Sequence, residues 1–161
     1  MIDLISYQEI YPSDYDVLTR IMISAFNEDT VMHTNQTEDG PPGYNDGSLV
    51  KRLNEHENFV SCKVMYGKDI VGAYSVGINQ DNEYSLEMLY IDPNFRGKHI
   101  GTKVWFDIEQ KFEEAVRWTV ETPDYSTRNH FFYTQKCGFN YYKENVYPNG
   151  AKSFIFEKVK I

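Results

Sequence analysis

The chain has 161 residues, 41% of them hydrophobic and 16% aromatic, and a formal net charge of −8. This length and apolar content fit a single domain over 1–161, and no run approaches the roughly eighteen apolar residues that cross a bilayer, so we expect no membrane association. The acidic balance argues against nucleic-acid binding, which depends on neutralising phosphates, and it suits either a cationic partner or simple solubility.

The first third of the chain is expected to form a strand, two helices and a long loop. The strand is expected over residues 2–7. An N-cap at Ser13 and apolar residues at helical spacing predict a helix over about 14–27. Residues 28–47 are dense in Gly, Pro, Asn and Asp, which predicts a loop of the kind that is functional or mobile. Residues 48–55 are expected to form a short second helix.

Three strands joined by short polar turns are expected in the middle of the chain. They cover 59–66, 70–78 and 84–91 and should form an antiparallel meander. After the loop that follows, apolar residues from Gly101 to Ala115 recur at helical spacing, which predicts a third helix.

The last third of the chain alternates strand and helix. A strand is expected over 118–122, and a helix over about 127–136 with Gly138 as its C-terminal stop. Two strands over about 139–146 and 151–159 complete the chain. The strand–helix–strand unit should be parallel and right-handed, so the sequence predicts an α/β fold with a mixed sheet.

The loop "YIDPNFRGKHIG" (90–101) joins an apolar strand to a helix and is basic on an otherwise acidic chain. The first turn of a helix exposes unpaired N–H groups at its positive end, and Gly97 and Gly101 would let an anion approach them. Arg96, Lys98 and His99 add cationic groups. The loop predicts a phosphate-bearing ligand, with an ordinary basic helix start as the alternative. Its spacing fits neither a Walker loop nor a dinucleotide fingerprint.

Two stretches carry a resemblance to a known family. The run "LEMLYIDPNFRGKHIGTKVWFDIE" (86–109) resembles the central motif of the GNAT superfamily of acyl-CoA-dependent N-acyltransferases. The family pattern [Q/R]-x-x-G-x-[G/A] falls on 96–101, and His99 stands where the family has its first glycine. "FFYTQKCGF" (131–139) is similar to a later family motif, Tyr-x-x-x-Gly-Phe. The resemblance implies a GNAT-like, mostly antiparallel sheet of about seven strands with helices on both faces.

The resemblance also implies a cofactor site for acetyl-CoA as co-substrate, without a metal. The strand before the loop would splay from its neighbour, and the backbone of Leu89, Tyr90 and Ile91 would face the pantetheine and thioester. One of those N–H groups would stabilise the tetrahedral oxyanion. The pyrophosphate would be held by the loop and helix start, namely Arg96, Gly97, Lys98, His99, Ile100, Gly101 and Thr102.

The catalytic roles implied by the resemblance fall on two residues. Glu87, an acid within an apolar run, is expected to act as base or to position the amine, with a structural ion pair as the alternative. The family tyrosine that protonates the thiolate matches Thr134, so the candidate acid is the neighbouring Tyr133, with aromatic packing as the alternative. Asn129 is a further cofactor-binding candidate, although the family asparagine matches Thr127.

The acceptor in this family enters opposite the cofactor. Here that region contains the loop with Tyr44, the turn near Tyr147, and four acids that suit a cationic amine or are simply solvated: Glu28, Asp29, Glu38 and Asp39. We expect direct attack by a primary amine of a small molecule or peptide in a ternary complex. The alternative is a non-catalytic acyl-CoA sensor or interaction module. Dimers are frequent among relatives, so a homodimer is a possible assembly.

The remaining chemistry-bearing residues predict no further site. Cys62 and Cys137 are too few for a disulfide scaffold and have no metal-ligand spacing, and Cys137 is expected to be a buried thiol at a helix end. The absence of a disulfide pattern and of an apolar N-terminal run predicts a cytoplasmic, reduced protein.

Overall fold

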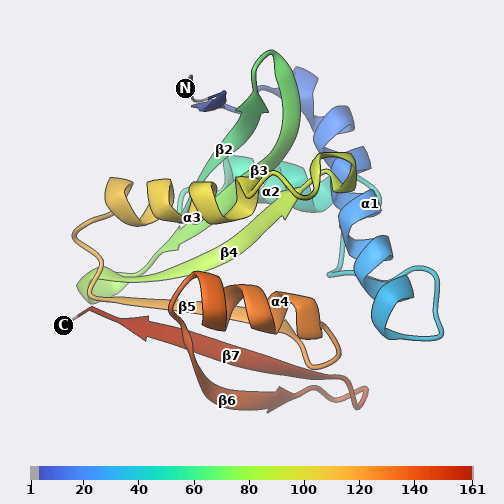
Figure 1. Cartoon of the computed structure of the whole chain (residues 1–161), viewed down its shortest axis with the longest axis vertical. Coiled ribbons are helices and arrows are strands. Elements are labelled where there is room, and N and C mark those ends of the chain that lie inside the picture. Colours follow the sequence, from blue (N-terminus) through green and yellow to red (C-terminus); the bar gives the residue numbers. More distant parts are fainter. Residues whose placement is uncertain (1–3, 161) are drawn as a thin grey trace.

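A seven-stranded sheet runs through the part of the chain that the structure describes, residues 4–160 of a computed structural model (Figure 1). Its strand order is β1-β2-β3-β4-β5-β7-β6, and among these residues only the β4–β5 pair is parallel. The strands are β1 (Ile5–Gln8), β2 (Phe59–Tyr66), β3 (Asp69–Ile78), β4 (Glu83–Ile91), β5 (Arg117–Pro123), β6 (Asn140–Val146) and β7 (Lys152–Val159). The α/β class and the mixed, mostly antiparallel sheet are confirmed. The predicted first strand included residues 2 and 3, which lie outside the described part.

Helices pack on both faces of the sheet, with α1 and α2 on one face and α3 and α4 on the other (Figure 1). Their bounds are α1 (Tyr15–His33), α2 (Ser48–Glu55), α3 (Ile100–Lys111) and α4 (Thr127–Phe131). A single π-helical turn, Phe132–Lys136, continues α4. Gly138 then ends this segment with a φ of 83°, the left-handed conformation that favours glycine, as predicted.

Helix α1 differs from its prediction at both ends. It begins at Tyr15 after a 3₁₀ turn, and the side chain that closes this turn is Asp14, whose Oδ2 accepts the N–H of Tyr11 at 2.8 Å. Ser13 is therefore not the cap. The helix continues to His33, so the predicted loop starts six residues too early. A hydrogen bond from Ser126 Oγ to the buried Asp29 joins this last part to the β5–α4 connection, a tertiary contact that local sequence does not reveal.

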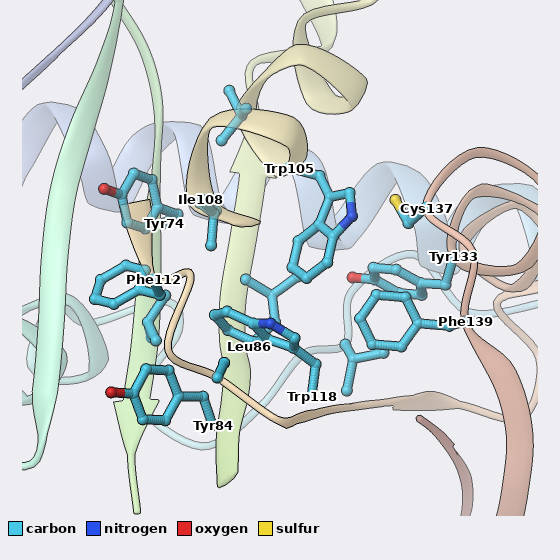
Figure 2. Close-up of a cluster of buried hydrophobic side chains, with 14 of the residues drawn as sticks. Tyr74, Tyr84, Leu86, Trp105, Ile108, Phe112, Trp118, Tyr133, Cys137 and Phe139 are labelled. Atoms are coloured by element: carbon cyan, nitrogen blue, oxygen red, sulfur yellow. The ribbon is translucent and has the colours of Figure 1, made fainter. Parts of the chain in front are cut away.

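Two buried clusters hold the helices to the sheet. The larger lies under α3 and α4, where aromatic rings meet edge to face (Figure 2). The Trp118 ring centroid lies 5.1 Å from that of Trp105 and 5.6 Å from that of Tyr84, geometry that adds to the energy of apolar burial. The smaller cluster joins α1 and α2 to the other face through residues such as Met22, and here Tyr90 points away from the larger cluster.

A β-bulge in β4 reverses which side chains face each cluster. Ser75 of β3 pairs with Met88, but the next residue, Val76, pairs with Leu86, so Glu87 is the extra residue. Before the bulge Leu86 faces the larger cluster, and after it Leu89 does. The strict alternation that would place Glu87 on one face with Leu89 and Ile91 is thus wrong.

Strand β4 separates from β5 soon after it begins. The two strands are in register only over Glu83–Ser85 and Arg117–Thr119. Beyond that point β5 remains paired with β7 on its other side, whereas residues 86–91 of β4 have no partner in β5. The predicted splay is confirmed, and it leaves one edge of β4 available for hydrogen bonding to another extended group.

Candidate active site

A cavity of about 320 Å³ opens where β4 ends and α3 begins. We call it the α3 cavity. Its walls come from the end of β4, the loop that follows, the first turn of α3, and α4. The lining residues are Leu89, Ile91, Asp92, Pro93, Phe95, Arg96, Gly97, His99, Ile100, Gly101, Thr102, Arg128, Asn129 and Phe132.

Most of the predicted cofactor residues lie on this wall. Of the eleven, Tyr90 and Lys98 do not line the α3 cavity. Tyr90 faces the other side of β4, and burial raises its pKa above the ordinary value for a tyrosine. The Lys98 ammonium lies over the ring of Tyr66, 5.7 Å from its centroid. Asn129 does line the cavity despite its displacement from the family position.

The loop is shaped to present the start of α3. Asp92 begins a turn, and its Oδ1 accepts the N–H of Asn94 at 2.9 Å. Gly97 has a φ of 83°, so it supplies a left-handed bend, and a Cβ added there would meet open space. The chain then enters α3 at Ile100, where the N–H groups of the first turn have no partner within the helix. These groups suit an anion.

His99 keeps the backbone conformation that a glycine would adopt. Its φ of 58° and ψ of 26° lie in the left-handed region, which is costly for a residue with a Cβ. The imidazole is exposed and lies on the cavity wall. The replacement therefore preserves the loop geometry at a cost in backbone strain, and it adds a nitrogen heterocycle at the rim.

Gly101 keeps the cavity wall free of a side chain. A Cβ placed there would lie 3.4 Å from the Phe132 ring, an ordinary contact, so the protein itself has room for it. Such a methyl group would instead narrow the α3 cavity, which Gly101 lines.

A second cavity of about 130 Å³ lies on the opposite side of β4, against α1. We call it the α1 cavity. It shares five lining residues with the α3 cavity, so the two meet at the splayed end of β4. Its lining residues are Ala25, Phe26, Asp29, Leu89, Tyr90, Ile91, Arg96, Arg128 and Asn129.

Glu28 on α1 ties together two guanidinium groups that line both cavities. Its Oε1 accepts from Nη1 and Nη2 of Arg128, both at 3.2 Å, and it forms an ion pair with Arg96. Burial works to raise the pKa of Glu28, but hydrogen bonds and charge from Arg96 and then Arg128 outweigh it and hold the pKa below its ordinary value. Arg96 is thus held by a carboxylate that an anionic ligand would have to replace.

The two predicted catalytic residues lie away from the cavities. Glu87 is exposed at the bulge, where its Oε1 accepts a hydrogen bond from Ser85 Oγ at 2.8 Å. Tyr133 is 8% exposed and packs in the larger cluster beside Phe139 (Figure 2). Burial and nearby negative groups raise its pKa, which makes it a weaker proton donor. Phe132, not Tyr133, lines the α3 cavity.

Other candidates are also accounted for. Thr134 Oγ1 donates to the carbonyl of His130 at 2.8 Å and lines neither cavity. Burial raises the pKa of the Cys137 thiol to about 12, which fits the predicted inert thiol. Tyr44 is buried and donates to Asn27 Oδ1, while Tyr147 donates to Glu121.

Sequence reasoning missed five residues that line the α3 cavity: Asp92, Pro93, Phe95, Arg128 and Phe132. Arg128 had a usable signal, because it precedes Asn129 on a helix already assigned to cofactor binding. Phe132 had one as well, because it lies three residues after Asn129 and four after Arg128, on the same face of the helix.

Searches for two other kinds of feature found none among the described residues. Between residues 4 and 160 no group of three or more His, Cys, Asp or Glu side chains is placed to hold a metal ion. Over the same range no helix has the length and apolar content to cross a membrane.

A splayed strand with a helix start that suits an anion on one face and a cavity containing Asp29 on the other suits group transfer between two bound molecules. The family model described as Acetyltransferase (GNAT) family matches residues 21–139. The chain therefore belongs to the GNAT acetyltransferase family, as its motifs indicated.

Individual proteins are similar to this chain in sequence or in fold. YrkN of Bacillus subtilis (strain 168) is 35% identical over 104 residues, which are 64% of this chain and 55% of that protein. The chain thus matches only about half of that relative's length. An acetyltransferase from Thermus thermophilus superposes with a TM-score of 0.76, 14% identity and 97% coverage of both chains. PaiA N-acetyltransferase from Thermoplasma acidophilum, solved in complex with coenzyme A, superposes with a TM-score of 0.72 and 16% identity. The match covers 97% of this chain and 99% of that one.

Proposed function

We propose that this protein is an acetyl-CoA-dependent N-acetyltransferase that acts on a primary amine by direct attack in a ternary complex. The observation that carries the proposal is the splayed end of β4, which has a cavity on each side and a common wall between them. Two molecules bound in these cavities would meet at Leu89 and Ile91.

The α3 cavity is the proposed acetyl-CoA site. Its residues fit a pyrophosphate, because the first turn of α3 offers N–H donors and Gly97 and Gly101 leave the backbone accessible. Arg96 would add charge after leaving Glu28. Bound there, acetyl-CoA would supply a thioester: the neutral amine would attack its carbonyl carbon, the C–S bond would break, and the proton lost from nitrogen would pass through water to the departing thiolate, giving an amide and CoA. The unpaired edge of β4, residues 86–91, offers main-chain groups to an extended pantetheine and an N–H to the developing oxyanion.

The α1 cavity is the proposed acceptor site. It reaches the shared wall from the opposite side, so an amine there approaches without displacing the cofactor. Holding both reactants in one geometry lowers the entropic cost of a reaction between two molecules.

Thiol release from acetyl-CoA, measured across a panel of amines, tests the proposal. We expect release that depends on the amine and saturates with it. The second candidate, a non-catalytic acyl-CoA binder, is favoured by the burial of Tyr133 away from the α3 cavity. It predicts acetyl-CoA binding with no release above the uncatalysed rate for any amine.

Two variants test the catalytic roles that the sequence suggested. Because Glu87 faces solvent and Tyr133 lies in the core, we expect Glu87→Gln and Tyr133→Phe to keep kcat/KM within about threefold of the wild type. A loss of a hundredfold or more from either variant would restore that residue as base or acid.

A further inference from the structure

Asp29 is a buried acid at the α1 cavity. It is 6% exposed, and it alone among the residues that line this cavity carries a carboxylate. Its Oδ2 accepts from Ser126 Oγ at 2.5 Å. Its Oδ1 has no hydrogen-bond partner within residues 4–160, because Nε2 of His33 lies 3.6 Å away, beyond hydrogen-bonding distance. A buried carboxylate oxygen without a donor is costly, and a ligand donor would remove that cost.

The rest of the α1 cavity limits the size of an acceptor. Ala25 and Phe26 lie on the same face of α1 as Asp29, and Leu89 and Tyr90 of β4 line the opposite wall, Tyr90 with its side chain on this face of the sheet. A volume of about 130 Å³ is well below that of pockets that hold a whole drug-sized ligand. The cavity therefore suits the amine end of a slim aliphatic chain.

The charges around the α1 cavity limit which charged groups the acceptor can carry next to its amine. Arg96, Arg128 and Glu28 form one linked group with two positive charges and one negative. If Arg96 turns to the pyrophosphate, as the proposed function requires, Glu28 and Arg128 remain as a neutral pair. Asp29 is then the carboxylate that remains at the cavity, with Nε2 of His33 at 3.6 Å from its Oδ1 as its nearest charge partner, and it favours a cation without an adjacent anion.

We propose that Asp29 binds the ammonium group of the acceptor, and that the acceptor is a primary alkylamine with no carboxylate on the carbon that carries the nitrogen. The proposal rests on the proposed function, because it assigns the acceptor side of the same site. Asp29 is here a binding residue, and it fixes the class of amine that reaches the thioester.

A matched pair of amines tests the acceptor class in the wild-type protein. Butylamine and norvaline share the same carbon chain, and norvaline adds a carboxylate beside the amine. With thiol release as the readout, we expect kcat/KM for butylamine to exceed that for norvaline by at least about a hundredfold, the ratio expected from about 2.7 kcal/mol. Equal or better use of norvaline would overturn the proposal. This comparison does not depend on the folding of any variant.

Three variants test Asp29 itself. Asp29→Asn is expected to raise KM for butylamine at least about thirtyfold, with kcat within about fivefold and the Kd for acetyl-CoA unchanged. Ser126→Ala removes the hydrogen bond to Oδ2 but keeps the charge, so it should raise KM by less than about fivefold. Asp16→Asn removes an exposed acid from the same helix and serves as the control, with no change expected.

The outcomes separate this proposal from the proposed function. Amine-dependent release that survives Asp29→Asn, or that falls equally with Ser126→Ala, overturns the role of Asp29 and leaves the transferase intact. No release with any amine overturns the transferase, and the acceptor assignment falls with it.

Discussion

The two halves of β4 belong to one strand but have different roles. The first half, before the bulge at Glu87, is paired with β3 and β5 and buries Tyr84 and Leu86 in the aromatic cluster. The second half keeps β3 but loses β5, and its residues line two cavities. The contrast indicates that the first half anchors the fold, so that the second can remain open at its edge without a partner strand.

The bulge is what allows this change within nine residues. An extra residue at position 87 shifts the face of the strand, which directs Leu89 and Ile91 to the α3 cavity and Tyr90 to the α1 cavity. Stability and ligand binding should therefore respond separately to changes in the two halves. The following predictions use that separation.

Weakening the packing around the first half of β4 should lower the free energy of unfolding and leave acetyl-CoA binding unchanged. Trp118→Ala removes a ring that is 3% exposed and contacts Trp105 and Tyr84, so we expect a loss of about 3–5 kcal/mol in the free energy of unfolding, measured with urea. Phe106→Ala, which removes an exposed ring from α3, is the matched control and should cost under about 0.5 kcal/mol. A large drop in acetyl-CoA affinity of the folded Trp118 variant would contradict the separation.

Narrowing the α3 cavity, which the second half of β4 lines, should weaken acetyl-CoA binding and spare stability. Gly101→Ala adds a methyl group that the protein can accommodate, and alanine favours a helix more than glycine by up to about 1 kcal/mol. We expect unchanged or higher stability and at least a tenfold loss of acetyl-CoA affinity, about 1.4 kcal/mol, by calorimetric titration. Gln110→Ala, exposed on the same helix, is the control for helix propensity. Unchanged affinity would mean that the ligand does not approach α3 here.

The strained loop offers a smaller and sharper test. His99→Gly should raise the free energy of unfolding by up to about 1 kcal/mol, because glycine adopts a φ of 58° without a Cβ penalty. His99→Ala removes the imidazole but keeps the Cβ, so it should bring no gain. If both variants shift stability equally, the imidazole and not the backbone governs this position.

The smallest expected effect concerns the link between the two cavities. Glu28→Gln weakens the hold on Arg96, so we expect acetyl-CoA affinity to rise about threefold, or about 0.7 kcal/mol. A fall in affinity would show instead that Glu28 positions Arg96 for the ligand.

The same carboxylate gives a dependence on pH. The pKa of Glu28 is lowered in the folded protein from an ordinary value of 4.5. A lowered pKa means that its contribution to stability is complete above about pH 4.5 and is lost as the pH falls through the folded value. Urea unfolding between pH 3 and 6 should therefore show a smaller acid-side loss in Glu28→Gln than in the wild type.

Much of the fold could be predicted from local patterns. The bounds of α2 and β2, the stop at Gly138 after the π-helical turn and the basic loop before α3 all follow from periodicity, caps and turn residues. What failed depends on contacts between distant segments. The extension of α1 to His33 rests on burial of Asp29 beside Ser126, ninety-seven residues away in the chain.

The residues that line the α3 cavity could be predicted better than the positions of Glu87 and Tyr133 for the same reason. The loop residues are consecutive, so their spacing alone brings them together. Glu87 and Tyr133 were placed by counting along a regular strand and a regular helix. The bulge at Glu87 breaks the alternation of the strand, and on the helix Phe132, four residues after Arg128, lines the α3 cavity whereas Tyr133 packs in the larger cluster.

Hydrogen exchange with and without acetyl-CoA tests most directly whether the opened half of β4 and the start of α3 form the cofactor site. We expect slower exchange on binding at the amides of residues 89–91 and 97–102, and little change over residues 83–86, which lie in the anchored half. Slower exchange elsewhere, with these amides unaffected at saturating acetyl-CoA, would contradict it.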